Sequence, residues 1–246
     1  MQPEPSRSML TKASDILAAF SVEHPVLTQA DITRRANLPH STTRRLVAEM
    51  LEHGMLERTQ NGRLMLGLRL WELGSLSQRV LPLRDTAIPF MTVLNQALGQ
   101  HVRLAVREGN EAVIVERLSA TNAVGLALDL RNRVSLHASA AGKALLAFAK
   151  DAEIADFLAQ PLPEFTPETI THPERLRRNL DDIRRQGYAL VREETQLGIA
   201  AVAAPIRTQR RQTVASLSVV VPNDFSDTEK LVHGVVAAAK SISGAL

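Results

Sequence analysis

The most constraining feature of this chain is the stretch from Thr28 to Gly67, which has the pattern of two short helices followed by a β-hairpin. The first helix would end at residues 37–39, Asn-Leu-Pro, because a residue before proline is disfavoured in helical conformation. The second helix then begins with a run of polar and basic residues. This order is typical of a winged helix-turn-helix, and it predicts a double-stranded DNA partner.

The first helix is expected to have Thr28 as its N-cap, and Asp31 three residues later would complete a capping box. Arg34 and Arg35 lie near the end of this helix. They would contact DNA phosphates, or only solvent.

The second helix is expected to begin at residue 40 or 41 and to bury Leu46, Val47 and Met50 on one face. That phasing leaves residues 41–45 exposed at its front end, where a recognition helix reaches base edges. Arginine can bond guanine through two hydrogen bonds, and serine or threonine can contact phosphates or bases. A capped surface helix without a DNA role is the alternative. The predicted DNA contacts on the two helices are Thr28, Arg34, Arg35, His40, Ser41, Thr42, Thr43, Arg44 and Arg45.

Asn61 and Gly62 lie between two runs of alternating residues, 55–59 and 63–66, and predict the turn of the hairpin. An Asn-Gly pair supplies the two positive-φ residues of a type I′ turn. Arg58 and Arg63 would flank this turn and approach the DNA backbone or the minor groove, and a plain solvent-exposed hairpin is the alternative. Arg58, Asn61 and Arg63 complete the predicted DNA contacts.

Charge adds only weak support for DNA binding. The net charge is +3, and residues 31–69 hold seven arginines against four acidic residues, so the rest of the chain sums to zero. A solvated helix face can show the same excess. The chain has no cysteine, which excludes disulfides and cysteine metal sites and fits a reducing cytoplasm. No run of about 18 apolar residues occurs, and no secretory signal is expected, so we predict a cytoplasmic chain without a membrane partner.

Beyond the hairpin, apolar residues at helical spacing over 68–80 predict a linking helix that offers an apolar face to a partner. The pattern then changes to mixed helices and strands, as in an α+β domain with an antiparallel sheet. The expected domains are 1–67, a linker helix over 68–81, and 82–246. Ser226 and Glu229 would form the capping box of the last helix. Helices are predicted at 84–98, 173–186 and 227–243, and strands at 101–107, 112–118, 123–130, 198–207 and 213–221.

No catalytic pattern is complete. The sequence Gly142-Lys143-Ala144 lacks both the earlier glycine and the final hydroxyl residue of a phosphate-binding loop. Ser139 and Lys143 are four residues apart, whereas the Ser-x-x-Lys pattern of hydrolases needs three. The seven histidines show no paired metal spacing. His137 is expected to be a packed or capping residue, and contact with a ligand is the alternative. We therefore expect no catalytic residue, no metal and no cofactor, although a hydrolase or transferase that uses the helix-turn-helix for docking is the alternative.

Five segments follow one another along the chain: LPHSTTRRL at 38–46, GRLMLGLRLWELG at 62–74, LHASAAGKA at 136–144, QGYA at 186–189 and EETQLGIAAVAAP at 193–205. In this order they resemble the IclR family of bacterial transcriptional regulators over nearly the whole chain. The resemblance implies a winged-helix DNA-binding domain, a linker helix and a GAF-like effector-binding domain. It also implies homodimers formed through the DNA-binding half, which often pair again into tetramers.

By this resemblance, the chain is a ligand-responsive regulator of a pseudo-palindromic operator, and its effector lies in a pocket over the sheet. Backbone amides at 141–143 would hold a carboxylate, because helix starts favour anions. Val191, Ala201 and Val220 replace more polar residues of pockets for small oxo-acids, so we expect a larger or more apolar acid, such as an aromatic one. The alternative is that these three residues are ordinary sheet core. The implied effector-binding residues are Ala140, Ala141, Gly142, Val191, Glu193, Ala201, Ser218 and Val220.

Overall fold

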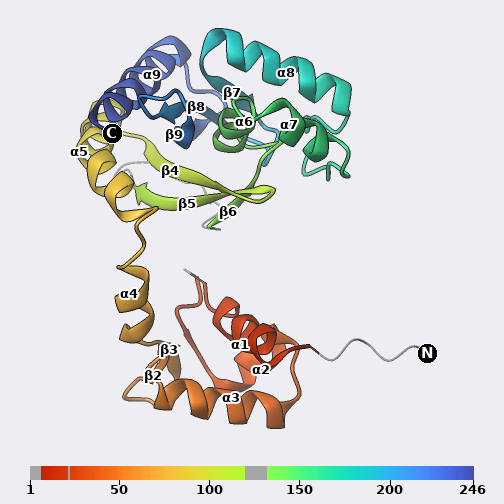
Figure 1. The fold of residues 1–246 in the computed structure, drawn as a ribbon, viewed down its shortest axis with the longest axis vertical. Coiled ribbons are helices and arrows are strands. Elements are labelled where there is room, and N and C mark those ends of the chain that lie inside the picture. The colour runs from red at the N-terminus through yellow and green to blue at the C-terminus, as the bar shows by residue number, and fades with distance from the viewer. Residues whose placement is uncertain (1–6, 22, 120–131) are drawn as a thin grey trace. The chain divides into compact units, whose positions relative to one another are not determined.

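The computed structural model of this chain describes residues 7–21, 23–119 and 132–246. The chain divides into two compact units, with the boundary between Gln78 and Arg79 (Figure 1). Each unit has its own cluster of buried apolar side chains, so each has its own core. Within the described residues, no helix is both long and apolar enough to cross a bilayer.

The first unit packs helices and a small antiparallel sheet around Ile16, Ile32, Val47, Leu56 and Leu64. The sheet has the strand order β1-β3-β2, and its two longer strands form the predicted hairpin. This is the predicted winged helix-turn-helix. The elements are α1 (Met9–Ala18), β1 (Val26–Leu27), α2 (Gln29–Ala36), α3 (His40–Glu52), β2 (Leu56–Arg58), β3 (Leu64–Leu66) and α4 (Leu68–Gly74).

The ends of α2 follow local rules. The hydroxyl of Thr28 accepts from the backbone N–H of Asp31, and the Asp31 carboxylate accepts from that of Thr28, which confirms the predicted capping box. The hydrogen bonds from Thr28 lower the pKa of Asp31. At the other end Asn37 adopts a left-handed conformation, with φ at 49°. Its N–H and that of Leu38 bond to carbonyls of the last helical turn, so the chain leaves α2 two residues before Pro39.

The hairpin turn differs from the predicted type I′ turn. Gly62 has a φ of 73°, but Asn61 is not among the residues with positive φ. The N–H of Gly62 donates to the carbonyl of Thr59, and the N–H of Thr59 donates to that of Arg63. These bonds define a three-residue loop with glycine at the left-handed position, so the prediction of a two-residue turn was wrong.

The helix predicted over 68–80 is also shorter than expected. The last helical residue of α4 is Gly74, and Ser75 Oγ donates to the carbonyl of Glu72 at 2.7 Å. The chain then runs through turns to Leu81, where α5 begins with Pro82 in its first turn. Proline suits that position because first-turn N–H groups have no partner within the helix.

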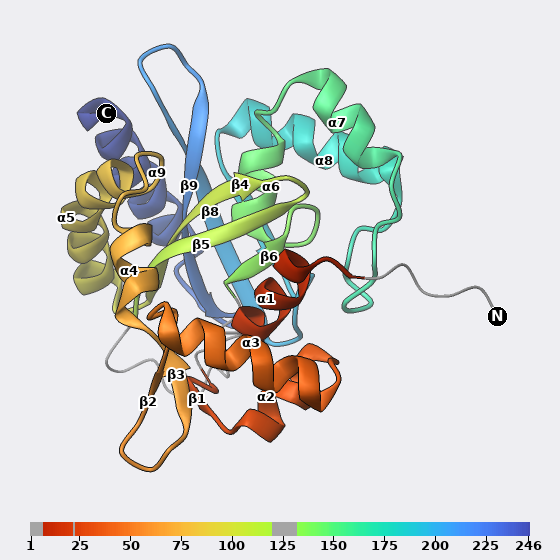
Figure 2. The ribbon, with the colours of Figure 1, turned by 60° about the horizontal axis from the view of Figure 1, so that its bottom comes forward.

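The second unit is built on a sheet whose order, within the described residues, is β6-β5-β4-β9-β8-β7, with antiparallel pairing throughout. Helices α5 and α9 cover one face, and α6, α7 and α8 cover the other (Figures 1 and 2). The elements are α5 (Leu81–Leu98), β4 (His101–Glu108), β5 (Glu111–Leu118), β6 (Arg133–Ser135), α6 (Ala140–Leu146), α7 (Asp151–Leu158), α8 (Pro173–Gln186), β7 (Ala189–Arg192), β8 (Ile199–Arg207), β9 (Thr213–Pro222) and α9 (Thr228–Ala245).

Most of the predicted elements are present. The bounds of β4, β5, β8 and β9 match the predicted strands to within one residue, and α8 has the predicted bounds. The strand predicted at 123–130 lies outside the described residues. The last helix has Asp227 as its N-cap in place of the predicted Ser226, and the Asp227 carboxylate accepts from the N–H of Lys230.

Side-chain alternation along β9 separates the two faces of the sheet. Leu217 and Val219 pack in the core beneath α5 and α9. The intervening Ser218 and Val220 point to the opposite face, because successive side chains of a strand alternate. That face carries α6, and the hydroxyl of Ser216 on it donates to the carbonyl of Ala141 at 3.0 Å.

Candidate functional site

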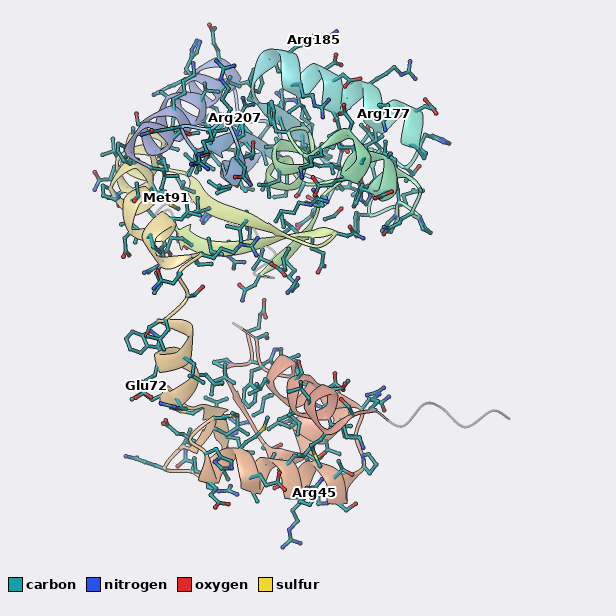
Figure 3. The ribbon with its side chains drawn as sticks, viewed as in Figure 1. Arg45, Glu72, Met91, Arg177, Arg185 and Arg207 are labelled. Carbon is teal, nitrogen blue, oxygen red and sulfur yellow. The ribbon has the colours of Figure 1, made fainter. Side chains whose placement is uncertain are left out.

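The first candidate site is the exposed face of α3. His40, Ser41, Arg44 and Arg45 are exposed there and, together with Ala48, line a shallow depression. Figure 3 shows the Arg45 side chain extending outward from α3. These residues share a face because they are spaced by one helical turn, at 40 and 44, 41 and 45, and 44 and 48. The surface combines hydrogen-bond donors and acceptors with positive charge.

Thr43 does not belong to this face, so the prediction that it is exposed was wrong. Its side chain is fully buried, and its hydroxyl donates to the carbonyl of Pro39 at 3.2 Å. Thr43 lies three and four residues before the buried Leu46 and Val47, which places all three on one side of the helix. Thr42 is half-buried.

Arg44 and Arg45, near the start of α3, differ in their surroundings. Arg45 forms an ion pair with Glu49, with Nη1 and Oε1 2.7 Å apart, and its Nη2 lies 3.3 Å from Met9 Sδ. Arg44, by contrast, has no hydrogen-bond or ion-pair partner within the described residues. Its guanidinium is therefore available to an external acceptor.

The other predicted DNA contacts are mostly held by neighbouring groups. Arg34 pairs with Asp31 at 2.8 Å, and Arg35 donates to the carbonyl of Ala19 at 3.4 Å. Arg58 donates to the carbonyl of Gly62 at 3.0 Å, which ties it to the hairpin turn. Thr28 is half-buried and serves as the cap of α2, whereas Asn61 and Arg63 are exposed beside the turn.

The second candidate site is a cavity of about 380 Å³ in the second unit, on the face of the sheet that carries α6. Its floor is formed by neighbouring strands, since Val191 pairs with Ala201 and Ala201 pairs with Val220. Six of the eight effector-binding residues implied by the resemblance line this cavity: Ala140, Ala141, Val191, Ala201, Ser218 and Val220.

Gly142 and Glu193 are not part of the lining that the described residues form. A Cβ on Gly142 would lie 2.2 Å from the carbonyl oxygen of Ser135, so this glycine allows α6 to pass close to the preceding loop. Glu193 has a φ of 58°, and its carboxylate accepts from the N–H of Gly198 at 2.7 Å, which closes the turn between β7 and β8.

The predicted backbone cradle for a carboxylate is also largely occupied. The N–H of Gly142 donates to Ser139 Oγ at 3.0 Å, and the N–H of Lys143 donates to the carbonyl of Ser139 at 2.9 Å. Two of the three predicted donors at 141–143 are therefore already bonded within the protein.

Sequence reasoning missed Arg103, which lines the floor of the cavity opposite Ser218 in the register of β4 and β9. The register places it directly beside the predicted Ser218. The cavity also has an aromatic side. The ring of His137 stacks on Phe165 with centroids 5.7 Å apart, and its centroid is 6.5 Å from that of Phe157. The pairing register would have identified Arg103, whereas nothing in the sequence brings these three rings together.

His137 is a buried, fully bonded histidine that also lines the cavity. Its Nε2 lies 2.9 Å from the carbonyl oxygen of Pro163, which can only accept, so Nε2 carries the proton. Nδ1 then accepts from the hydroxyl of Ser135 at 2.7 Å. Burial lowers the pKa of His137, although the hydrogen bond to Pro163 acts in the opposite direction. Burial thus favours the neutral ring in the folded protein. Among the described residues, no group of three acidic or histidine side chains is placed to hold a metal ion.

Comparisons with known proteins agree with this arrangement. Residues 9–60 match the IclR helix-turn-helix domain, and residues 76–244 match the C-terminal domain of the bacterial transcriptional regulator IclR. The chain is 32% identical to the HTH-type transcriptional regulator KipR of Bacillus subtilis, over 85% of this chain and 84% of KipR. It is 33% identical to the HTH-type transcriptional repressor AllR of Klebsiella pneumoniae, over 88% of this chain and 82% of AllR.

Among solved structures, the chain is similar to an IclR homologue from Microbacterium hydrocarbonoxydans that was crystallised with 4-hydroxybenzoate. The two share 38% identity with a TM-score of 0.87, over 96% of this chain and 98% of the homologue.

We predict that replacing His137 alters the pH dependence of stability. In the unfolded chain this histidine has its ordinary pKa of about 6.5, whereas its pKa in the folded chain is lower. Between these two pKa values the unfolded chain binds a proton that the folded chain does not. The free energy of unfolding should therefore fall as the pH drops below the ordinary pKa, until the pH reaches the folded pKa. His137→Gln should show a smaller decrease in the free energy of unfolding than the wild type, in urea unfolding measured from about pH 8 to 5, around the ordinary pKa.

His172→Gln, at an exposed histidine, is the control and should follow the wild type. Equal slopes for His137→Gln and the wild type would contradict the prediction.

Proposed function

Because this chain belongs to the IclR family of transcriptional regulators, we propose that it binds a pseudo-palindromic operator as a homodimer and responds to a small aromatic acid. The observation that carries the proposal is the exposed polar and basic face of α3 in a helix-turn-helix regulator. The relatives are regulators, which favours this function over that of a hydrolase or transferase with a docking module. We assign DNA binding to residues 1–67, linkage to 68–81 and effector binding to 82–246.

On this proposal α3 lies in the major groove with Arg44 at the base edges. Its guanidinium has no competing partner in the described part of the chain, and arginine bonds guanine O6 and N7 together. Ala48, one turn further along, presents a short apolar side chain that suits a thymine methyl group. Ser41 and His40 contact bases or phosphates near the start of the helix. Thr43 has no direct role, since it is buried.

The remaining contacts are proposed for the DNA backbone. Arg45 is held by Glu49, so it suits a phosphate, which requires one charge at a fixed place rather than base readout. Arg63 and Asn61 on the hairpin approach the backbone or the minor groove. The further phosphate contacts proposed are Thr28, Arg34, Arg35, Thr42 and Arg58.

We predict that Arg44→Ala weakens specific binding by about 1–3 kcal/mol, or roughly 5- to 150-fold in Kd, because a bidentate base contact is lost. Binding is measured by gel shift, at one salt concentration, on the region upstream of the protein's own gene. Arg178→Ala removes the same charge from an exposed position of α8 and serves as the control, with wild-type affinity expected. Wild-type binding by Arg44→Ala would refute the assignment of Arg44 as a base reader.

The effector proposal combines the cavity with the 4-hydroxybenzoate-bound homologue. The volume of about 380 Å³ lies toward the small end of ligand pockets, which suits a single aromatic ring. Phe157, Phe165 and His137 supply an aromatic side for that ring. Arg103 is the proposed partner of the carboxylate, because it lines the floor of the cavity and is the register partner of Ser218.

We predict that Arg103→Met weakens binding of 4-hydroxybenzoate by at least about tenfold, because a hydrogen bond to a charged group contributes roughly 1.5–3 kcal/mol. Affinity is measured by titration calorimetry. Arg107→Met, on the same strand but outside the cavity lining, is the matched control and should bind as the wild type does. Loss of binding in both variants, or in neither, would contradict a carboxylate contact at Arg103.

The proposed dimer forms through an exposed apolar surface on β3 and α4. Isolated exposed apolar side chains are ordinary, but a cluster of large ones marks an interaction surface. Trp71 on α4 is 70% exposed. The exposed apolar residues of this region are Leu66 on β3, Leu68, Trp71 and Leu73 on α4, and Leu76 just after α4.

We predict that the wild type has a mass in solution of twice the 26.9 kDa chain, or more if dimers pair. Trp71→Glu should shift the mass toward that of the monomer at micromolar concentration, because a carboxylate would be buried in the interface. Light scattering after size-exclusion chromatography measures the mass. Leu10→Glu, at a residue of α1 that is 80% exposed, is the control for charge on the same unit. An unchanged mass for Trp71→Glu would place the interface elsewhere.

A further inference from the structure

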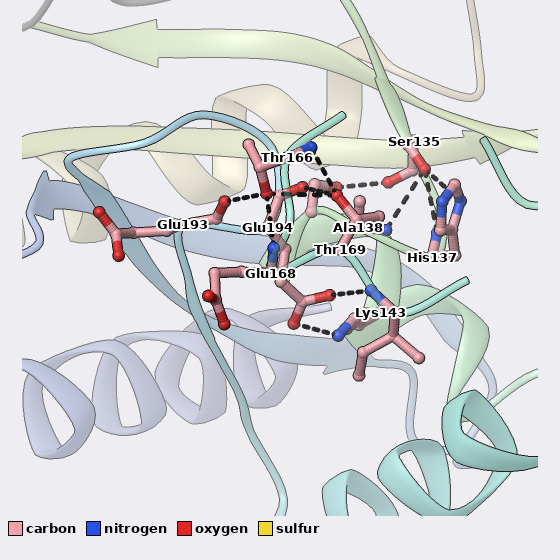
Figure 4. A network of polar contacts seen from close by, with 11 residues as sticks. Ser135, His137, Ala138, Lys143, Thr166, Glu168, Thr169, Glu193 and Glu194 are labelled. Atoms are coloured by element: carbon pink, nitrogen blue, oxygen red, sulfur yellow. Dashed lines mark hydrogen bonds and ion pairs between the residues drawn. The ribbon is translucent and has the colours of Figure 1, made fainter. Parts of the chain in front are cut away.

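The second unit contains a buried ion pair beside the cavity. Lys143 on α6 is fully buried, and its Nζ lies 2.5 Å from Oε1 of Glu194 (Figure 4). Glu194 lies in the turn between β7 and β8 and is itself buried. Burial lowers the pKa of Lys143, and the opposite charge of Glu194 acts against that shift. Neither side chain lines the cavity that the described residues enclose.

Stability alone does not account for a pair of this kind. Removing two charges from water costs several kcal/mol per ion, and the attraction between them offsets that cost only when the geometry is good. Apolar residues of similar volume often serve as well or better at such positions. The benefit of the pair must therefore be sought in the groups that it holds in place.

The Glu194 turn is bonded to a second segment of the chain. Thr169 Oγ1 donates to the Glu194 carbonyl at 2.7 Å, and Thr166 Oγ1 donates to the Glu193 carbonyl at 2.6 Å. Thr169 Oγ1 also accepts from the N–H of Thr166 at 2.9 Å and from that of Phe165 at 3.1 Å. The turn at 193–198 and the segment 165–170 therefore form one bonded assembly, which Lys143 connects to α6 (Figure 4).

Each part of this assembly carries residues of the cavity wall. Phe165 belongs to the threonine segment, and Thr195 and Gln196 follow Glu194 directly. Ala140 and Ala141 lie on α6, within one turn of Lys143. The ion pair thus connects three segments that contribute residues to the cavity lining: α6, the segment 165–170 and the turn at 193–198.

We propose that Lys143 and Glu194 are positioning residues for the effector pocket: the buried pair holds Phe165, Thr195 and Gln196 at the distance from α6 that the bound acid requires. This inference rests on the proposed effector function. It assigns the pair to the shape of the pocket and not to direct contact with the effector.

The test separates position from stability with a double variant, Lys143→Met/Glu194→Leu, which removes both charges and keeps similar volumes. Arg84→Met/Glu116→Leu removes an ion pair between α5 and β5 that lies outside the cavity lining, and it is the matched control. Urea unfolding reports stability. Amide hydrogen exchange without ligand reports the order of 165–170 and 193–198, and calorimetry with 4-hydroxybenzoate reports the pocket.

We expect the double variant to unfold at a urea concentration close to that of the wild type. Exchange at 165–170 and 193–198 should nevertheless rise by about tenfold, and the affinity for 4-hydroxybenzoate should fall by about tenfold, because local order is lost. The control should change neither readout. Wild-type exchange and affinity in a stable double variant would overturn the proposal.

A second variant covers the case in which the double variant does not fold. Glu194→Gln keeps the size and one acceptor but removes the charge, so faster exchange confined to the two segments is expected. Unchanged exchange in Glu194→Gln would refute the positioning role. If the wild type itself does not bind 4-hydroxybenzoate, the aromatic-acid effector is refuted, and the exchange comparison decides the role of the pair by itself.

Discussion

The register of β4, β9 and β8 is the constraint on which the second unit depends. Pairing Arg103 with Ser218, and Ala201 with Val220, brings these side chains together on the cavity face. The intervening residues of the same strands fill the core beneath α5 and α9. A shift of one residue would exchange the two sets, placing an arginine in an apolar core and removing the floor of the cavity. The fold and the cavity therefore share one determinant, the pairing register of these strands.

The periodicity of side chains also determines which residues of α3 are exposed, but here the period is that of a helix. Residues three and four apart on a helix lie on one face, which places Thr43 with the buried Leu46 and Val47 and leaves Arg44 outside. Because Thr43 is buried, the surface proposed to contact DNA contains fewer side chains of residues 41–45 than the sequence analysis predicts. Within that surface, the ion pair between Arg45 and Glu49 further distinguishes the two arginines.

Much of the fold could be predicted because its determinants are local. The capping box of Thr28, the strands β4, β5, β8 and β9, and the bounds of α8 all follow from periodicity and neighbouring residues. The predicted effector-binding residues came from the resemblance, and six of the eight line the cavity. The two implied residues outside its lining have structural roles that the resemblance does not reveal. Gly142 is needed for close packing against Ser135, and Glu193 closes a turn with Gly198, so neither faces the cavity.

The sequence by itself determined the helix-turn-helix, the order of strands and helices along the second unit, and the family, because periodicity, caps and motifs are properties of neighbouring residues. Only the tertiary structure decided which side chains are brought together on the sheet and which form the ion pair beside the cavity. Strand pairing places Arg103 at the cavity, and the fold brings Lys143 into contact with Glu194, which lies 51 residues further along the chain. Such contacts depend on how distant segments pack, and no local pattern contains that information.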